Sequence, residues 1–188
     1  MSSMRRGMDT ELVSRAQRGD KGAYALIATE VADRYLAVAR RILRDLDLAE
    51  DATQNALLTI WLDLPQLRDP ARFEAWSYRL LVRACYAEGG RERRWAPNLR
   101  ILPIDEPVAA DDLGSVADRD QLERGFRRLS LDHRTVVVLH HFLDLPLERV
   151  AEICGIPTGT AHSRLHHAIR ALRAALEADS RAPVREVI

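Results

Sequence analysis

Residues 145–176 constrain the fold more than any other part of this sequence, because two helical patterns there flank a tight-turn signal. The apolar positions of the first pattern recur at i, i+3, i+4 and i+7, on Leu147, Val150, Ala151 and Cys154. Gly155 permits a sharp turn, Pro157 prevents the first helix from continuing, and Thr158 can cap the second helix. The stretch therefore predicts a helix-turn-helix.

The second predicted helix has one apolar side and one polar side. Its apolar stripe comprises Ala161, Leu165, Ala168, Ile169, Leu172 and Leu176. The opposite side carries Thr160, Ser163, Arg164 and His167, flanked by His162, His166, Arg170 and Arg173. No acidic residue occurs from Pro157 to Leu176, and a carboxylate there would repel a phosphate backbone. We therefore predict that this helix binds DNA; the alternative is a solvated helix in an ordinary bundle.

Charge is segregated along the chain. The formal net charge of the 188 residues is zero, which argues against a protein that coats nucleic acid by bulk charge. Residues 79–100 contain six arginines and two glutamates, a local excess of +4. Residues 105–123 contain seven acidic residues and one arginine, a local balance of −6. This segregation predicts separate surfaces for separate partners.

The hydrophobic pattern is helical nearly throughout, and capping residues mark several helix starts. Asp47 and Glu50 form a capping-box pattern for a helix that ends near Asp63. Asp69-Pro70 restarts a helix, with the aspartate as cap and the proline at the first helical position. This helix is expected to end at Gly89-Gly90.

These helices group into two small domains, so the predicted fold class is all-α, with a flexible acidic linker between the domains and the helix-turn-helix in the second. Prolines and a glycine punctuate the linker, and helical periodicity returns at Asp118. The remaining helices are expected at 10–18, 22–43 and, capped by Ser130, to about Leu143. The predicted boundaries are 9–96 for the N-terminal domain, 97–117 for the linker, 118–178 for the C-terminal domain and 179–188 for a tail.

The sequence carries no pattern for catalysis or for a bound cofactor. It has no Gly-rich phosphate loop, nucleophile elbow or clustered carboxylate pair, so we expect no enzymatic activity. His162 and His166 could share an ion, but no third ligand shares their spacing, so no metal site is expected. Cys85 and Cys154 lie inside predicted helices without metal-binding spacing, which indicates a reduced, cytoplasmic setting. No apolar run approaches about 18 residues, so no membrane insertion is expected.

Two blocks of the sequence resemble bacterial sigma factors, specifically the compact extracytoplasmic-function (ECF) branch. The N-terminal block, similar to sigma region 2, is DLAEDATQNALLTIW followed by FEAWSYRLLVRACYAEGGRERR. The C-terminal block, similar to sigma region 4, is LSLDHRTVVVLHHFLDLPLERVAEICGIPTGTAHSRLHHAIRALRAAL. Together they cover most of the chain in the family's order. The resemblance implies a transcription initiation factor that binds core RNA polymerase, directs it to specific promoters and assists DNA melting.

In the family, the helix that begins at a DAED-like motif binds the coiled coil of the polymerase clamp. The residues on one face of the corresponding helix here are Asp47, Asp51, Gln54 and Asn55. An acidic, amide-bearing face suits a basic partner helix, and we expect Asp51 and Gln54 to make the contacts. Glu50 is expected to act only as a cap, and Trp61 to lie in the core. The resemblance further implies contact with the polymerase flap and control by an anti-sigma factor.

The next helix carries the surface expected to read the minus-ten promoter element. Arginines interleaved with aromatic rings suit exposed bases and their phosphates, since stacking contributes about 1–3 kcal/mol per base. The expected contact residues are Arg79, Arg83, Tyr86, Arg91, Arg93 and Arg94, with Trp95 extending the surface. The resemblance implies that residues 64–72 form the loop that captures a flipped base. Phe73 and Trp76 are expected in the core, whereas Tyr78 fits either the core or the surface.

The C-terminal domain is expected to bind the minus-thirty-five element as duplex DNA. Its expected contact residues are Thr160, Ser163, Arg164 and His167 in the major groove, with Arg170 and Arg173 on phosphates. The acidic residues from 105 to 120 match the family's connector, which passes through the polymerase. Their negative charge would imitate nucleic acid in a basic channel; the alternative is a solvated tether.

The chain departs from the family's pattern in both blocks. Arg83, Ala87 and Glu88 stand where members usually have an Asn and then an Asp with a neighbouring His. Gly89-Gly90 is expected to interrupt a helix that is often continuous. We expect these changes to alter the minus-ten preference. His162 replaces a frequent lysine, and a neutral imidazole attracts phosphate less.

A conventional helix-turn-helix regulator with an N-terminal dimerisation or sensing bundle is the second interpretation. It predicts tight, polymerase-independent binding to a palindromic duplex. The sigma interpretation predicts weak binding alone and strong promoter binding only with core polymerase. A gel-shift with and without core enzyme separates the two.

Overall fold

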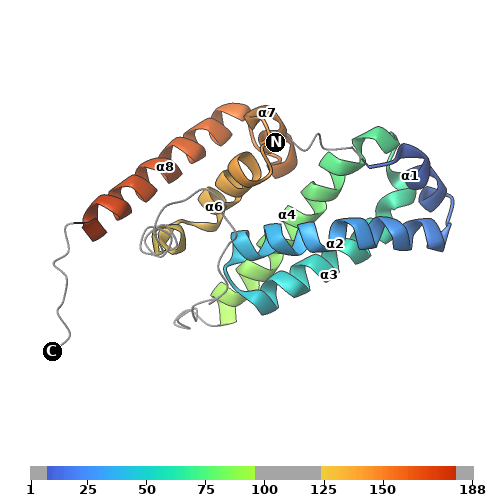
Figure 1. The fold of residues 1–188 in the computed structure, drawn as a ribbon, viewed down its shortest axis with the longest axis horizontal. Coiled ribbons are helices and arrows are strands. Elements are labelled where there is room, and N and C mark those ends of the chain that lie inside the picture. Colours follow the sequence, from blue (N-terminus) through green and yellow to red (C-terminus); the bar gives the residue numbers. More distant parts are fainter. Residues whose placement is uncertain (1–7, 96–123, 181–188) are drawn as a thin grey trace.

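The computed structural model describes residues 8–95 and 124–180, and the side chains of 8–90 and 124–177. All regular structure in these two ranges is helical, which confirms the predicted all-α class. The predicted linker, the tail and the side chains of Arg91, Arg93 and Arg94 lie outside the described residues. Two groups of helices lie side by side, α1 to α4 in one and α6 to α8 in the other (Figure 1).

The N-terminal group begins with α1 and continues through three long helices. Its elements are α1 Thr10–Gln17, α2 Lys21–Leu43, α3 Leu46–Asp63, the 3-10 turns η1 Leu64–Gln66 and η2 Pro70–Arg72, and α4 Phe73–Trp95. The fully buried residues that join α2, α3 and α4 include Ile27, Val31, Tyr35, Ile42, Ala52, Ile60, Phe73 and Leu81. These apolar faces explain why the three helices pack as one bundle.

Aromatic residues anchor the centre of this bundle. The Tyr35 hydroxyl donates a hydrogen bond to Ser77 Oγ at 2.6 Å, and the Tyr35 and Tyr78 rings lie 5.3 Å apart. Tyr78 is 2% exposed, so it belongs to the core. Phe73 is buried as predicted, and Trp76 packs against it half-buried, with ring centroids 6.1 Å apart. Helix α4, which contributes Phe73, Trp76 and Tyr78, is therefore held in place by a closely packed inner face.

The start of α3 differs from the predicted capping box. Arg44 adopts a left-handed conformation (φ 64°) that ends α2, and Asp45 then accepts a hydrogen bond from the Leu48 amide at 2.9 Å. Asp47 lies in the first turn of α3 and is exposed. The prediction that Asp47 caps the helix is therefore wrong. Because α2 ends abruptly at its left-handed residue, the extended conformation that a cap requires falls on Asp45 instead.

Alanine substitutions at two aspartates, two positions apart, distinguish the observed cap of α3 from the predicted one. Replacing Asp45 by alanine is expected to lower the free energy of unfolding by about 1 kcal/mol, because an amide at the α3 N-terminus loses its acceptor. The Asp47→Ala variant retains that hydrogen bond and is expected to change stability by less than about 0.5 kcal/mol. Urea denaturation followed by circular dichroism measures both. Equal losses in the two variants would contradict the assignment of the cap.

Helix α4 continues past Gly89-Gly90 to Trp95, so the predicted interruption is wrong. The structure gives a packing reason for the first of these glycines. A Cβ atom at Gly89 would lie 3.2 Å from Leu131 Cδ2 and 3.3 Å from Leu43 Cδ2, whereas one at Gly90 would meet nothing within 4 Å. Gly89 thus serves a close contact between helices rather than a helix end.

The C-terminal group contains the helix-turn-helix. Residues 124–128 are helical, followed by α6 Leu131–Val137, which continues as the π-helical turn η3 Val138–Phe142, then α7 Leu147–Cys154 and α8 Thr158–Ser180. Ser130 caps α6 as predicted, accepting from the His133 amide at 3.3 Å. Gly155 ends α7 in a left-handed conformation (φ 67°). Thr158 is the first residue of α8 rather than its cap, because the Pro157 carbonyl already accepts from the Thr160 and Ala161 amides.

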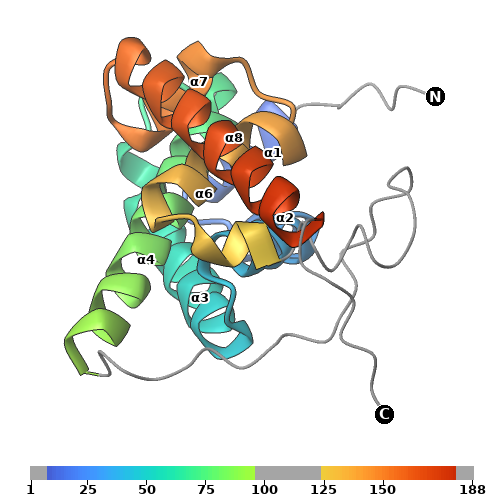
Figure 2. The same ribbon diagram turned by 90° about the vertical axis from the view of Figure 1, so that its left-hand side faces the viewer.

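The two groups contact each other along α4 and the end of α2. Helix α4 packs against α7, and α2 packs against α6, as both views show (Figures 1 and 2). Arg134 Nη1 donates to the Leu43 carbonyl at 3.4 Å, and the Arg41 guanidinium lies 3.7 Å from the centre of the Phe142 ring. Among the described helices, none has the length and apolarity that crossing a membrane requires.

Candidate nucleic-acid interface

Helix α8 presents the predicted minus-thirty-five residues in two different environments. Ser163, His167, Arg170 and Arg173 are exposed, and Thr160 is half-buried. Arg164 is held within its own domain, because its Nη2 forms an ion pair with Asp132 Oδ2 at 2.7 Å. Four members of the predicted apolar stripe, Ala161, Leu165, Ala168 and Leu172, are buried, and the other two, Ile169 and Leu176, are half-buried. One continuous side of α8 therefore faces solvent, as the helical period predicts.

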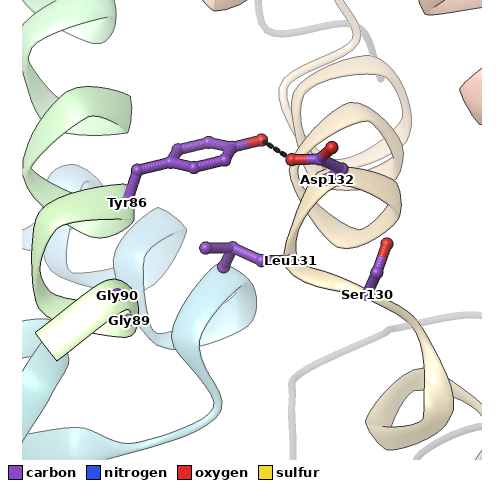
Figure 3. A pocket seen from close by; sticks show the side chains of 6 residues that line it. All are labelled: Tyr86, Gly89, Gly90, Ser130, Leu131 and Asp132. Carbon is purple, nitrogen blue, oxygen red and sulfur yellow. Dashed lines mark hydrogen bonds between the residues drawn. The ribbon is translucent and has the colours of Figure 1, made fainter. Parts of the chain in front are cut away.

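Helix α4 brings Arg79, Arg83 and Tyr86 to one face, as their spacing predicts. Arg83 is exposed, whereas Arg79 and Tyr86 are half-buried and bonded to the C-terminal domain. Arg79 Nη2 donates to the Glu152 carbonyl at 2.9 Å, and the Tyr86 hydroxyl donates to Asp132 Oδ1 at 2.7 Å (Figure 3). Burial and then the hydrogen bond to Asp132 raise the pKa of Tyr86 above its ordinary value, so its hydroxyl remains a donor.

The segment 64–72, expected to capture a base, contains the turns η1 and η2, joined by residues 67–69. Gln17 Nε2 anchors it by donating to the carbonyls of Leu64 at 3.2 Å and Leu67 at 2.6 Å. Asp69 caps η2 by accepting from the Ala71 amide at 3.0 Å. Arg72 Nη2 donates to Glu152 Oε1, so this segment also contacts α7.

One residue of the α8 surface, Arg164, shares a cleft with the described residues of the α4 surface. Its volume is about 430 Å³, and its lining includes Arg79, Arg83 and Tyr86 from α4 and Asp132, Cys154 and Arg164 from the C-terminal domain. Beside it, Tyr86 reaches from α4 to Asp132 above Gly89 and Leu131 (Figure 3). Sequence reasoning assigned no role to Asp132 or Glu152, and nothing in their local sequence pattern distinguishes them from other surface acids.

The outer face of α3 is separate from this cleft. Asp47, Asp51, Gln54 and Asn55 are exposed there, as the helical period predicts. Asn55 Nδ2 donates to Glu88 Oε1 at 3.1 Å, which ties α3 to α4. Trp61 is half-buried and its ring lies 4.8 Å from that of Tyr24, so it belongs to the packed side.

Two leucines extend the outer face of α3 and were missed by sequence reasoning. Leu58 is 57% exposed and Leu62 is 62% exposed. They follow Asp51 at i+7 and i+11, so they lie on the same side of the helix. That spacing was the available signal, but leucines in a helix are ordinarily assigned to the core.

Comparison with known proteins decides the family. Residues 27–94 match the family model for sigma-70 region 2, and residues 119–172 match the model for sigma-70 region 4. The RNA polymerase sigma-E factor of Streptomyces avermitilis is 32% identical over 161 residues, an alignment that covers 82% of this chain and 87% of that protein. The chain belongs to the ECF sigma factors. A conventional helix-turn-helix regulator, the second interpretation of the sequence, is not supported.

Other relatives align with the sigma factor over most of its length. The RNA polymerase sigma-H factor of Pseudomonas aeruginosa is 28% identical over 181 residues, which is 90% of this chain and 94% of that one. A solved structure of the sigma factor RpoE of Bartonella quintana, in complex with the anti-sigma factor NepR, has a TM-score of 0.64 at 24% identity. It covers 83% of this chain and 98% of that chain, and it supports the fold alone.

The family boundaries agree with the two groups of helices in the sigma factor. The region 2 match begins in α2 and ends in α4, and the region 4 match contains α6, α7 and most of α8. Most of helix α8 therefore falls in the region 4 match, and the arginine-bearing face of α4 falls in the region 2 match.

The cysteines of the sigma factor are poorly suited to redox chemistry. Burial raises the pKa of the Cys85 thiol to about 12 and that of the Cys154 thiol to about 11. Both thiols are therefore protonated near neutral pH, and a protonated thiol is a weak nucleophile. Within residues 8–95 and 124–180, no group of three or more His, Cys, Asp and Glu side chains is arranged to hold a metal ion.

Proposed function

We propose that this sigma factor binds core RNA polymerase through the outer face of α3 and promoter DNA through α4 and α8. The single observation that carries the proposal is the order of the two family matches: the first contains the predicted minus-ten surface, and the second contains the predicted minus-thirty-five surface except Arg173. Sigma factors are non-catalytic initiation factors, so the polymerase performs the chemistry. The structure supports the proposal by placing three chemically distinct faces on three helices.

The α3 face suits a basic partner helix with apolar side chains. Asp47, Asp51 and Gln54 present charge and hydrogen-bonding capacity to solvent, and these groups complement lysine and arginine. Leu58 and Leu62 add apolar area at the end of the same face. Partially apolar interface centres with polar surroundings are typical of specific protein contacts. We assign this face to the polymerase clamp, and the flap contact to the C-terminal domain.

The two candidate DNA surfaces suit different forms of DNA. The α4 face combines Arg79 and Arg83 with the Tyr86 ring, which suits unpaired bases and their phosphates at the minus-ten element. The α8 face presents Ser163, Arg164 and His167 from a helix-turn-helix, which suits base edges in a duplex major groove. Arg170 and Arg173 lie further along α8 and are assigned to phosphates.

The leucines of α3 provide a test that leaves the core intact. The Leu58→Ala/Leu62→Ala variant is expected to weaken core polymerase binding about tenfold or more, because two exposed side chains lose an apolar contact in the complex. The Leu26→Ala variant is the matched control, since Leu26 is 60% exposed on α2. Fluorescence anisotropy with labelled sigma factor measures the affinity. A loss in the control equal to that in the double variant would count against the assignment.

The proposed function itself is tested by run-off transcription. Purified sigma factor and core polymerase are mixed with genomic DNA fragments, and the start sites are sequenced. Initiation at defined sites that requires the sigma factor is the expected result, and gel-shifts should show strong promoter binding only with core present. Tight binding without core, or no initiation at any site, would overturn the proposal.

We also propose an anti-sigma factor as a third partner. The Bartonella quintana RpoE structure contains such a protein, and both sequence blocks of this chain resemble that branch. Co-purification from the native host would identify the protein.

A further inference from the structure

The outer side of α8 carries histidines where a DNA-binding helix would often carry permanent charges. We propose that His162, His166 and His167 contact the minus-thirty-five duplex as protonated imidazoles, so that promoter binding takes up protons and strengthens as the pH falls. His162 and His166 thereby join the DNA-contact residues of α8. This inference rests on the proposed function, because it takes α8 as the helix that binds duplex DNA.

The three histidines lie on the solvent-facing side of α8. His162, His166 and His167 are all exposed. His162, His166 and Arg170 follow one another at four-residue spacing, so they form one line along the helix. Figure 1 shows α8 on the side of the C-terminal group that is away from α2 and α3. A duplex can therefore reach this line of side chains.

The N-terminal half of α8 holds a single permanent charge. The N-terminal residues of a recognition helix are those that contact base edges in helix-turn-helix proteins. From Thr158 to His167 the only permanently charged residue is Arg164. Its Nη2 pairs with Asp132 Oδ2 at 2.7 Å, and its side chain is 26% exposed. The exposed positive charge at this end of α8 therefore depends on whether the histidines are protonated.

Helix α6 adds a fourth imidazole to this group. The centre of the His133 ring lies 6.4 Å from that of His167, which in turn lies 5.9 Å from that of His166. Two protonated rings at such distances repel each other, and a phosphate beside them offsets the repulsion. A bound phosphate backbone therefore favours the protonated rings, and by linkage protonation favours binding of the backbone.

Carboxylates near α8 already have cationic partners. Helix α8 packs against α6 and α7, and against residues 124–128 through Gly125. Asp132 is paired with Arg164, and Glu152 accepts from Arg72 and Arg149. Within the described residues, no hydrogen bond or ion pair joins a carboxylate to any of the four imidazoles. The ionisable groups on these elements, besides the four histidines, are Asp132 and Arg134 on α6, Glu148, Arg149, Glu152 and Cys154 on α7, Arg124, Arg127 and Arg128 in residues 124–128, and Arg164, Arg170, Arg173 and Glu177 on α8.

The direction of the pH effect follows from the charge of the two forms of the ring. A histidine side chain ordinarily gains its proton as the pH falls from about 8 to about 5. Above this range the rings are neutral and affinity for the duplex is lowest; affinity rises as the pH falls through the range and is constant below it. Each protonated ring that replaces a condensed counterion also steepens the dependence of log K on log salt concentration by about 0.9. The salt dependence therefore reports how many rings are charged in the complex.

Two matched templates isolate the contact between α8 and the duplex. The first is a labelled promoter mapped by run-off transcription, and the second is the same promoter truncated just downstream of its minus-thirty-five element. Holoenzyme binding to each is measured by fluorescence anisotropy at pH 8 and pH 6 and at several salt concentrations. The ratio of the two affinities cancels the effects of pH on the core enzyme and on melting. The test variant is His162→Gln/His166→Gln/His167→Gln, and the control, His141→Gln, removes an exposed histidine from η3 of the same domain.

The affinity ratio of the wild type is expected to be about tenfold higher at pH 6 than at pH 8, since an exposed charge contact changes affinity by about twofold to fivefold. Its salt dependence should steepen by about 2 to 3 over the same range. The glutamine variant should give the same ratio at both pH values, and the His141→Gln control should behave as the wild type. A wild-type ratio that is independent of pH, or an equal pH dependence in the glutamine variant, would overturn the proposal.

A second variant separates the charge of the rings from their shape. His162→Lys/His166→Lys carries two permanent charges at exposed positions, so it should bind the full promoter more tightly than wild type at pH 8 and should respond less to pH. Weaker binding than wild type at both pH values would show that the rings act through their shape, which overturns the proposal. Initiation at mapped sites together with an affinity ratio that is independent of pH rejects proton uptake alone. No initiation at any site rejects the proposed function and this inference with it.

Discussion

Replacing Asp51 by arginine is expected to abolish co-purification of this sigma factor with core RNA polymerase. Asp51 is exposed at the centre of the outer face of α3, between Asp47 and Gln54. Against a basic partner helix, an arginine replaces attraction with repulsion. Juxtaposed like charges cost several kcal/mol, and about 3 kcal/mol corresponds to a hundredfold loss of affinity.

The same substitution should leave the fold intact, because surface changes alter stability by no more than about 0.5 kcal/mol. The control is Asp33→Arg, which introduces the same charge change at an exposed position on α2. Pull-down with tagged core and thermal unfolding are measured on both variants. Normal co-purification of the Asp51→Arg protein would show that the clamp contact lies elsewhere.

Local features of the fold could be predicted from the sequence with good accuracy. The caps at Asp69 and Ser130, the turn at Gly155 and the apolar stripe of α8 each depend on residues within about four positions. The error at the start of α3 is also local. Asp45 and Asp47 are both acceptable caps. Which of them caps the helix depends on the left-handed conformation of Arg44, a conformation that an arginine rarely adopts.

The contacts between the domains could not be predicted, because they join residues far apart in the chain. Arg72 and Glu152 are separated by 80 positions, and Tyr86 and Asp132 by 46. The chain has 28 basic and 28 acidic residues, so charge alone does not select these pairs. Gly89 shows the same limit, since the sequence suggests a helix end and only the position of Leu131 reveals a packing contact.

Helical periodicity predicted which residues of the candidate site share a face of their helix. Arg79, Arg83 and Tyr86 share a side of α4 as expected, and the acidic residues share a side of α3. Periodicity does not say which face a second domain covers. It also does not identify exposed leucines such as Leu58, because burial depends on which helices pack nearby.

Replacing Arg164 by alanine is expected to reduce transcription from promoters that depend on a minus-thirty-five element. An arginine that reads a base edge contributes about 1–3 kcal/mol, so the run-off product should fall about tenfold or more. The loss should be largest on templates that retain the native element and small on templates in which it is mutated. Arg173→Ala is the comparison, because loss of a phosphate contact weakens binding about equally on all sequences.

The structure adds a second consequence of the Arg164→Ala substitution, which is measured on the sigma factor without core polymerase. In the free sigma factor Arg164 binds Asp132, which also accepts from Tyr86. Without the arginine, Asp132 loses its ion pair, and a solvated carboxylate is a weaker link between the domains. Single-strand binding without core should therefore stay constant or rise while promoter-dependent transcription falls. Unchanged run-off product would contradict the minus-thirty-five role, and a parallel fall in both measurements would indicate a damaged domain rather than a lost contact.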